Sequence, residues 1–209
     1  MRCEVALIRK TFKAMLTRRH FVFALLGFIP CAANAFEIPL VSSAVASAND
    51  AGTAMSTREL IDLPGYFYRG ADRSHLLYVR LETPWSLLAF VASEVRTTYG
   101  PPKNKLMKEI AARTVFNVIA TAFSTVLRFN DNMVVILKQN GKVVHPLKKE
   151  YDNDTDVLTV NDQAGYSTSL RATFDAKQLD VKSPFTIVIT NIELDRTEYT
   201  FEVDSANIK

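Results

Sequence analysis

The spacing of apolar and polar positions predicts that regular structure begins near Leu60. Residues 75–82 (HLLYVRLE) partly alternate between the two classes, which is typical of a strand. Thr83 as N-cap and Pro84 at the first helical position then predict a helix that ends before residues 100–102 (GPP). The apolar positions of that helix recur every three or four residues: Leu87, Leu88, Val91 and Val95.

A second helix is predicted from Lys105 onward. Its apolar stripe follows the i, i+3, i+4, i+7 pattern and consists of Val115, Val118, Ile119, Ala122, Phe123, Val126 and Leu127. The β-branched and aromatic residues within 115–123 (VFNVIATAF) also favour a strand. Helix is the first interpretation of this segment, and strand is the alternative.

From Phe129 onward, short apolar runs and turn residues predict a β-rich region. Residues 133–138 (MVVILK) and 142–145 (KVVH) flank Asn140-Gly141, which suits the positive φ angles of a type I′ hairpin turn. Three further strands are predicted, at residues 169–174, 185–190 and 198–203. The sequence therefore predicts an α+β fold, in which a strand and two helices pack on a C-terminal antiparallel β-sheet or β-sandwich.

The first 35 residues have the order of features that is typical of an export signal. Basic residues precede a short apolar core at 21–29 (FVFALLGFI), and Ala33-Asn34-Ala35 provides the small-x-small pattern for cleavage before Phe36. The core is shorter than the roughly 20 residues that cross a bilayer, so the mature chain is expected to have no transmembrane span. A short buried helix is the alternative. Met15 would begin a more compact signal and is a second candidate for the true start.

Two adjacent arginines within the predicted signal suggest a particular export route. Arg18 and Arg19 are followed by His20-Phe21, which resembles the twin-arginine export motif. Adjacent arginines also arise simply because signal peptides begin with a basic region, so ordinary export is the alternative. In both cases the chain is expected to act in the periplasm or outside the cell.

Composition and charge exclude several classes of protein. The chain has 209 residues, 48% hydrophobic and 22% charged, which is ordinary for a globular protein and unlike a disordered, collagen-like or polytopic membrane protein. The predicted leader holds six of the 25 lysines and arginines and one of the 22 acidic residues, so the mature formal charge is −2. This balance argues against a nucleic-acid partner. Cys3 and Cys31 leave with the leader, which excludes a disulfide, a thiol nucleophile and a zinc–thiolate site in the mature chain.

The segment after the leader predicts a tether. Residues 41–57 (VSSAVASANDAGTAMST) are small and polar without clear periodicity. We therefore expect a flexible tether over residues 36–57 and one globular domain over residues 58–209. A frayed helix, favoured by the alanines, is the alternative.

A cluster of acidic residues suggests a cation site. Asp152, Asp154 and Asp156 place carboxylates at every second position, and Ca²⁺ prefers such oxygen ligands. The segment departs from an EF-hand loop, because Val157 replaces the turn glycine and Gln163 replaces the bidentate glutamate. A polar surface loop is the alternative. Ca²⁺ is thus the one metal hypothesis, and no organic cofactor is expected.

Aromatic residues suggest a binding platform. Tyr66, Tyr68 and Trp85 are rigid side chains of the kind that stack on a sugar or a peptide side chain. Burial of these residues in the core is the alternative.

Known catalytic motifs do not appear in the sequence. A GxSxG elbow, an HExxH pair, a Walker A loop and a GxGxxG loop are all absent. The sequence therefore favours an exported soluble accessory protein of the cell envelope that has a binding or structural role, with an envelope protein, a peptide or a glycan as partner. A periplasmic hydrolase that uses Asp/Glu carboxylates is the rival hypothesis, and a deep pocket with converging acidic groups would favour it.

Overall fold

The computed structural model describes residues 37–69, 76–98, 104–125, 132–151, 156–160, 162–191 and 198–208. These residues all belong to one compact unit, Ala32–Lys209. The α-helices in the described residues are α1 (Ser42–Ala54), α2 (Thr57–Ile61), α3 (Pro84–Thr98) and α4 (Asn104–Ala111). The strands are β1 (Phe67–Arg69), β2 (Leu76–Glu82), β3 (Val115–Ser124), β4 (Met133–Gln139), β5 (Lys142–Val144), β6 (Lys148–Tyr151), β7 (Asp156–Val160), β8 (Gln163–Asp175), β9 (Phe185–Asn191) and β10 (Glu198–Val203). Two short 3₁₀ helices are η2 (Ala176–Gln178) and η3 (Ser205–Asn207).

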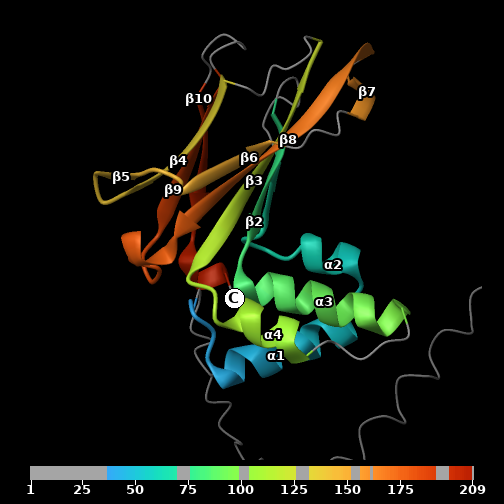
Figure 1. The fold of residues 1–209 in the computed structure, drawn as a ribbon. Coiled ribbons are helices and arrows are strands. Elements are labelled where there is room, and N and C mark those ends of the chain that lie inside the picture. Colours follow the sequence, from blue (N-terminus) through green and yellow to red (C-terminus); the bar gives the residue numbers. More distant parts are fainter. Residues whose placement is uncertain are drawn as a thin grey trace, which may run out of the picture. The chain divides into compact units, whose positions relative to one another are not determined.

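The strands form two antiparallel sheets. Sheet A has the order β1-β2-β3-β8-β6, and β7 also pairs with β8 (Figure 1). Sheet B has the order β10-β9-β4-β5. The combination of antiparallel sheets with a few helices agrees with the coarse prediction. The expected division into an N-terminal part and a C-terminal sheet does not hold, because β1, β2 and β3 share sheet A with β6 and β8.

Both sheets contribute to one hydrophobic core. The core face of sheet A includes Val79, Leu81, Val118, Ala120, Leu170 and Ala172, and sheet B adds Val135, Leu137, Ile187, Ile189 and Val203. Aromatic rings connect the two sheets, since the Phe116 ring of β3 lies 5.8 Å from that of Phe174 and 6.3 Å from that of Phe185. One face of each sheet therefore packs into this shared core.

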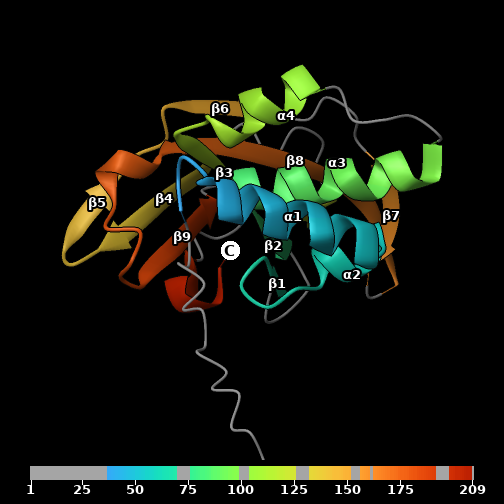
Figure 2. The same ribbon diagram turned by 90° about the horizontal axis from the view of Figure 1, so that it is seen from below.

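The helices gather at one end of the strands (Figure 1). Seen from that end, α1 and α3 lie side by side (Figure 2). The start of α3 confirms the predicted cap: Ser86 N donates to Thr83 Oγ1 at 3.2 Å, and Thr83 N donates to Ser86 Oγ at 2.9 Å. Leu88 and Ala89 of α3 are fully buried in the core. The helices therefore join the same core as the sheets.

The predicted second helix is correct only for its first turns. Helix α4 ends at Ala111, and residues 115–124 form strand β3 instead. Strand β3 pairs with β2 on one side and β8 on the other, and its side chains from Phe116 to Ser124 are buried on both faces. A strand that is buried on both faces has a nearly continuous apolar run, which periodicity cannot separate from a helical stripe.

The segment predicted as a tether contains helix α1, as the alternative interpretation allowed. Ala48 is fully buried, and Gly52 lies against α3 so closely that a Cβ there would stand 2.2 Å from the Ala89 carbonyl oxygen. Small residues lack the strong apolar pattern of most helices, but they let two helices approach closely. The small side chains of this segment therefore serve helix packing and not flexibility.

The predicted hairpin at Asn140-Gly141 is confirmed. The turn between β4 and β5 has φ angles of 49° at Asn140 and 76° at Gly141, as a type I′ turn requires. Strands β9 and β10 pair in register from Glu198–Thr190 to Val203–Phe185. The buried residues of β9 are Phe185, Ile187, Val188 and Ile189.

Candidate functional site

The face of sheet A that points away from the core carries polar side chains at alternate positions. In β2, Val79 and Leu81 belong to the core. Tyr78, Arg80 and Glu82 alternate with them, so their side chains lie on the opposite face of the sheet. We call this the outer face. It carries Tyr78, Arg80, Glu82, Asn117, Ile119, Thr121, Ser169, Arg171 and Thr173.

The strand register arranges these residues in cross-strand rows. The first row is Arg80, Ile119, Arg171 and Glu150. The second row is Glu82, Asn117, Thr173 and Lys148. The third row is Tyr78, Thr121 and Ser169. Residues that are far apart in the sequence thus become neighbours on one face.

The carboxylate of Glu82 is the centre of a buried hydrogen-bond network. Glu82 is 5% exposed, and its Oε1 accepts hydrogen bonds from Asn117 Nδ2 at 2.6 Å and from Arg171 Nη1 at 3.3 Å. Thr173 Oγ1 donates to Asn117 Oδ1 at 2.8 Å, which fixes the amide. Arg80 Nη2 lies 3.7 Å from Glu82 Oε2. One buried carboxylate therefore holds two arginines close together, which compensates the cost of its burial.

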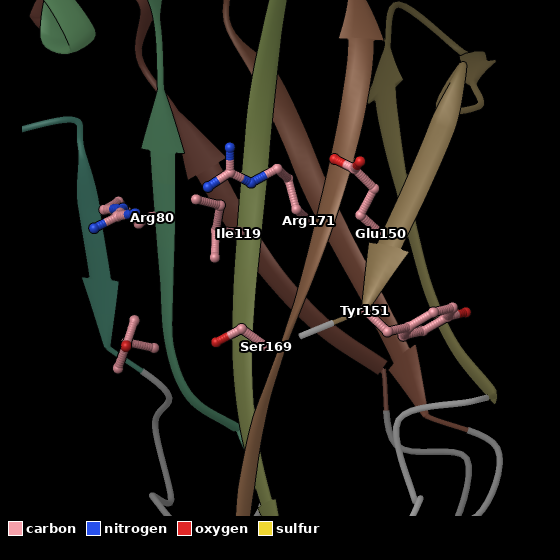
Figure 3. Close-up of a pocket in the computed structure, with 7 residues that line it drawn as sticks. Arg80, Ile119, Glu150, Tyr151, Ser169 and Arg171 are labelled. Atoms are coloured by element: carbon pink, nitrogen blue, oxygen red, sulfur yellow. The ribbon is translucent and has the colours of Figure 1, made fainter. Parts of the chain in front are cut away.

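A cavity of about 360 Å³ opens beside this network. Its lining comes from four strands and consists of Tyr78, Arg80, Ile119, Glu150, Tyr151, Ser169 and Arg171. Figure 3 shows Arg171 extending from β8 above Ile119 toward the side of Arg80. The hydroxyl groups of Ser169 and Thr121 are hydrogen-bonded to each other, with 2.7 Å between the two oxygen atoms. The cavity thus has an apolar floor at Ile119 and charged walls.

The arginines supply more donors than the described residues use. The Arg171 side chain is 44% exposed, and the Arg80 side chain is 29% exposed. Arg80 Nε is buried and has no hydrogen-bond partner among the described residues. A guanidinium has five N–H donors in a planar fork that matches a carboxylate or a phosphate. This side of the cavity is therefore suited to an anionic group.

The third charged residue of the lining, Glu150, is exposed and ionised at neutral pH. A hydrogen bond from Lys148 lowers the pKa of the Glu150 carboxyl, and the positive charges of Lys148 and Arg171 lower it further. The negative charge of Glu150 thus reduces the positive charge of the cavity lining, to which two arginines contribute.

The predicted aromatic platform is not formed. Tyr66 is 3% exposed and Trp85 is 2% exposed, and their rings stack at 6.1 Å within the core. Tyr68 is half-buried, donates a hydrogen bond to the Gly65 carbonyl at 3.0 Å and packs against Phe201. Burial, with a smaller contribution from the charge of Asp204, raises the pKa of Tyr68 to about 12. These aromatic rings belong to the core, as the alternative interpretation held.

The cation and export predictions fall mainly on residues that are not described. Asp152 and Asp154 lie outside the described residues, and Asp156 begins β7 opposite Ser167. Within the described ranges, no group of three or more His, Cys, Asp or Glu residues is placed to hold a metal ion. The export motif and the cleavage site also lie outside the described residues: Arg18, Arg19, Ala33, Ala35 and Phe36. The calcium and export hypotheses remain predictions.

Sequence reasoning missed Arg80, Glu82 and Arg171. A partial signal is present, because Tyr78, Arg80 and Glu82 alternate with apolar residues in β2. Such alternation shows only that a strand has a polar face. Which strands lie next to each other, and in which register, decides which polar residues meet.

Comparisons with known proteins do not identify a family. No protein-family model matches the chain. No curated protein matches it. Among solved structures, the chain is similar to an IgNAR antibody domain C1, with 8% sequence identity over 44% of this chain and 76% of that chain and a TM-score of 0.28. A similarity this low carries no argument about fold or function. Among the described helices, none is both long enough and apolar enough to span a membrane.

Proposed function

We propose that this chain is an exported accessory protein of the cell envelope that binds an envelope protein or peptide through the cavity on the outer face of sheet A. The supporting observation is the pair Arg80 and Arg171, which the buried carboxylate of Glu82 holds beside a cavity of about 360 Å³. Arginine is enriched where proteins recognise partners, and pockets of this size accept a side chain or a small ligand. Recognition of a glycan is the alternative outcome of the test below.

The export hypothesis rests on the sequence of the leader. A basic region, a short apolar core and Ala33-Asn34-Ala35 precede the described domain. If the twin-arginine route operates, changing both Arg18 and Arg19 to Lys blocks export. If ordinary export operates instead, the double lysine variant is processed and reaches the periplasm in the normal amount. Mass spectrometry of the native product tests cleavage before Phe36, and an unprocessed cytosolic chain would contradict it.

The rival hydrolase hypothesis has weaker support at this cavity. A carboxyl group that acts as a general acid at neutral pH needs a raised pKa. The pKa of Glu150 is lowered instead. Both Asn117 and Arg171 donate to Glu82 Oε1, so that oxygen is already engaged in the network. Glu82 is thus suited to hold the arginines, and Glu150 is paired with Lys148, so neither carboxylate is arranged to transfer a proton.

Partner capture tests the binding hypothesis. The full chain carrying an affinity tag is expressed in its host, cross-linked in the intact envelope and purified. We expect a discrete partner that is lost with Arg171→Glu and retained with Lys149→Glu. Lys149 is an exposed residue of β6 beside Glu150, so this control makes the same change in charge without altering the cavity lining. Equal recovery of the partner with both variants would contradict the proposal.

A further inference from the structure

We propose that the cavity on the outer face of sheet A binds a single carboxylate group between Arg80 and Arg171. This inference rests on the proposed function and names the chemistry that the site recognises. The carboxylate comes either from an acidic side chain or from the C-terminus of a peptide. Four features of the structure support this assignment: the free donors, the spacing of the arginines, the local charge and the size of the cavity.

The donors that face the cavity are incompletely used. Arg171 donates to Glu82 through Nη1, and its side chain is still 44% exposed. Arg80 Nη2 lies 3.7 Å from Glu82 Oε2, and the Arg80 side chain is 29% exposed. The exposed parts of the two guanidinium groups are therefore the donors that an acceptor in the cavity can reach.

The spacing of the two arginines suits one small group. Arg80 and Arg171 occupy the same cross-strand row, with Ile119 between them. Adjacent strands lie about 4.8 Å apart, so the two backbones are separated by about 10 Å. Arg171 bends over Ile119 toward Arg80 (Figure 3), which shortens the gap between the charged ends. A carboxylate above Ile119 can therefore accept from both side chains.

The local charge favours a singly charged anion over a doubly charged one. Two guanidinium groups face Glu82, which stays in place because Asn117 and Arg171 both donate to it. Glu150 adds a second negative charge at the far wall, where Lys148 partly offsets it. Binding of one carboxylate brings the net charge of the cavity close to zero. A phosphate dianion carries a second negative charge, which both glutamates repel.

The size and lining limit the ligand to about one residue of a peptide. The cavity volume of about 360 Å³ is near the lower end of the range for small-molecule sites. Tyr78, Ile119 and Tyr151 provide apolar surface next to the arginines. A terminal residue with an apolar side chain, or an acidic residue within a peptide, fits this combination.

Titration of the full chain with small probes tests the assignment. The probes are N-acetylvaline for a C-terminal carboxylate, N-acetylaspartic acid α-amide for an acidic side chain, N-acetylvalinamide as the uncharged control, and inorganic phosphate. The readout is the shift of backbone amide resonances at residues 80, 119 and 171. We expect saturable binding of at least one carboxylate probe, with a Kd on the order of 1 mM. Binding by neither carboxylate probe, equal binding of the uncharged amide or tighter binding of phosphate would each overturn the proposal.

Four variants separate a specific site from general attraction. Arg171→Gln is expected to weaken carboxylate binding about tenfold, because a charge-assisted hydrogen bond is lost. Arg171→Lys keeps the charge but loses the planar fork. It is expected to bind the carboxylate more tightly than Arg171→Gln does and more weakly than the original protein does. Glu150→Gln removes a negative charge from an exposed position and is expected to tighten binding several-fold. Lys149→Gln is expected to change nothing, and thermal melting of each variant verifies that it folds.

The outcomes distinguish this inference from the proposed function. If Arg171→Glu abolishes partner capture but no carboxylate probe binds, the binding function stands and the carboxylate assignment fails. If carboxylate probes bind but partner capture is unchanged, the site exists and the proposed use of it fails. If Arg171→Gln affects neither the titration nor the capture, both proposals fail.

Discussion

Asn117 Nδ2 donates a hydrogen bond of 2.6 Å to the buried carboxylate of Glu82. The two residues stand opposite each other on β3 and β2, and Thr173 on β8 holds the Asn117 amide from the other side. Three strands of sheet A are thus linked on their outer face by side chains as well as by the backbone ladder. A charged residue is tolerated at a position that is 5% exposed because these partners surround it.

Removing the amide of Asn117 is expected to destabilise the fold. Asn117→Ala leaves Glu82 Oε1 with one donor fewer and leaves Thr173 Oγ1 without its acceptor. We expect a loss of about 1–3 kcal/mol in the free energy of unfolding, measured with urea. Thr200→Ala, an exposed change on β10 in sheet B, is the control and should cost less than about 0.5 kcal/mol. Equal stability of both variants would show that the network contributes nothing.

Helix α1 is expected to depend on the glycine at its contact with α3. In Gly52→Ala, the new Cβ would lie 2.2 Å from the Ala89 carbonyl oxygen, so the two helices must separate. We expect a loss of about 1–3 kcal/mol, despite the higher helix propensity of alanine. Asp50→Ala on the exposed side of the same helix should be neutral or slightly stabilising. A stabilised Gly52→Ala protein would show that α1 does not pack against α3 in this way.

The turn between β4 and β5 offers a test of backbone conformation alone. Gly141 has a φ of 76°, and a Cβ there would meet no atom within 4 Å. Gly141→Ala therefore costs only the strain of a left-handed conformation, which is about 1–2 kcal/mol. Asn140→Gly, at the other positive-φ position, should be close to neutral. The measurement is the urea midpoint of each variant, and an unchanged midpoint for Gly141→Ala would be inconsistent with a type I′ turn.

Tyr68 is expected to make the folded state sensitive to alkaline pH. Its pKa is raised to about 12, whereas tyrosine in an unfolded chain titrates near pH 10. The folded state thus favours the neutral phenol, and the resulting stability is complete below about pH 10 and is lost as the pH rises toward 12. In Tyr68→Phe, the free energy of unfolding should fall less steeply over this interval than in the original protein.

The same variant is informative at neutral pH. Tyr68→Phe loses the hydrogen bond from the phenol to the Gly65 carbonyl, so we expect it to be less stable by about 1 kcal/mol at pH 7. The difference between the two proteins should therefore shrink between pH 10 and 12. Parallel pH curves for the two proteins would contradict the raised pKa.

Features that depend on neighbouring residues in the chain were predictable from the sequence. Thr83 and Pro84 mark the start of α3 for a local reason. The Thr83 hydroxyl accepts a hydrogen bond from a backbone N–H of the first turn, and Pro84 has no N–H that needs a partner. Asn140 and Gly141 mark a hairpin turn because their backbone angles are intrinsically accessible to these residue types. Strand β9 also follows from its own residue types, because residues 185–190 are rich in β-branched side chains.

Features that depend on distant partners were decided by the tertiary structure. Residues 115–124 form a strand and not a helix because β2 and β8 pair with both edges of this segment, and the surrounding structure buries both of its faces. Residues 42–54 form a packed helix because α3 presents Ala89 and Ala92 to Gly52. The sequence by itself determined where α3 and the Asn140-Gly141 turn begin and which strands have a polar face. Only the order and register of the strands in sheet A brought Arg80 and Arg171 to the same cavity, because a one-residue shift would turn either side chain to the opposite face.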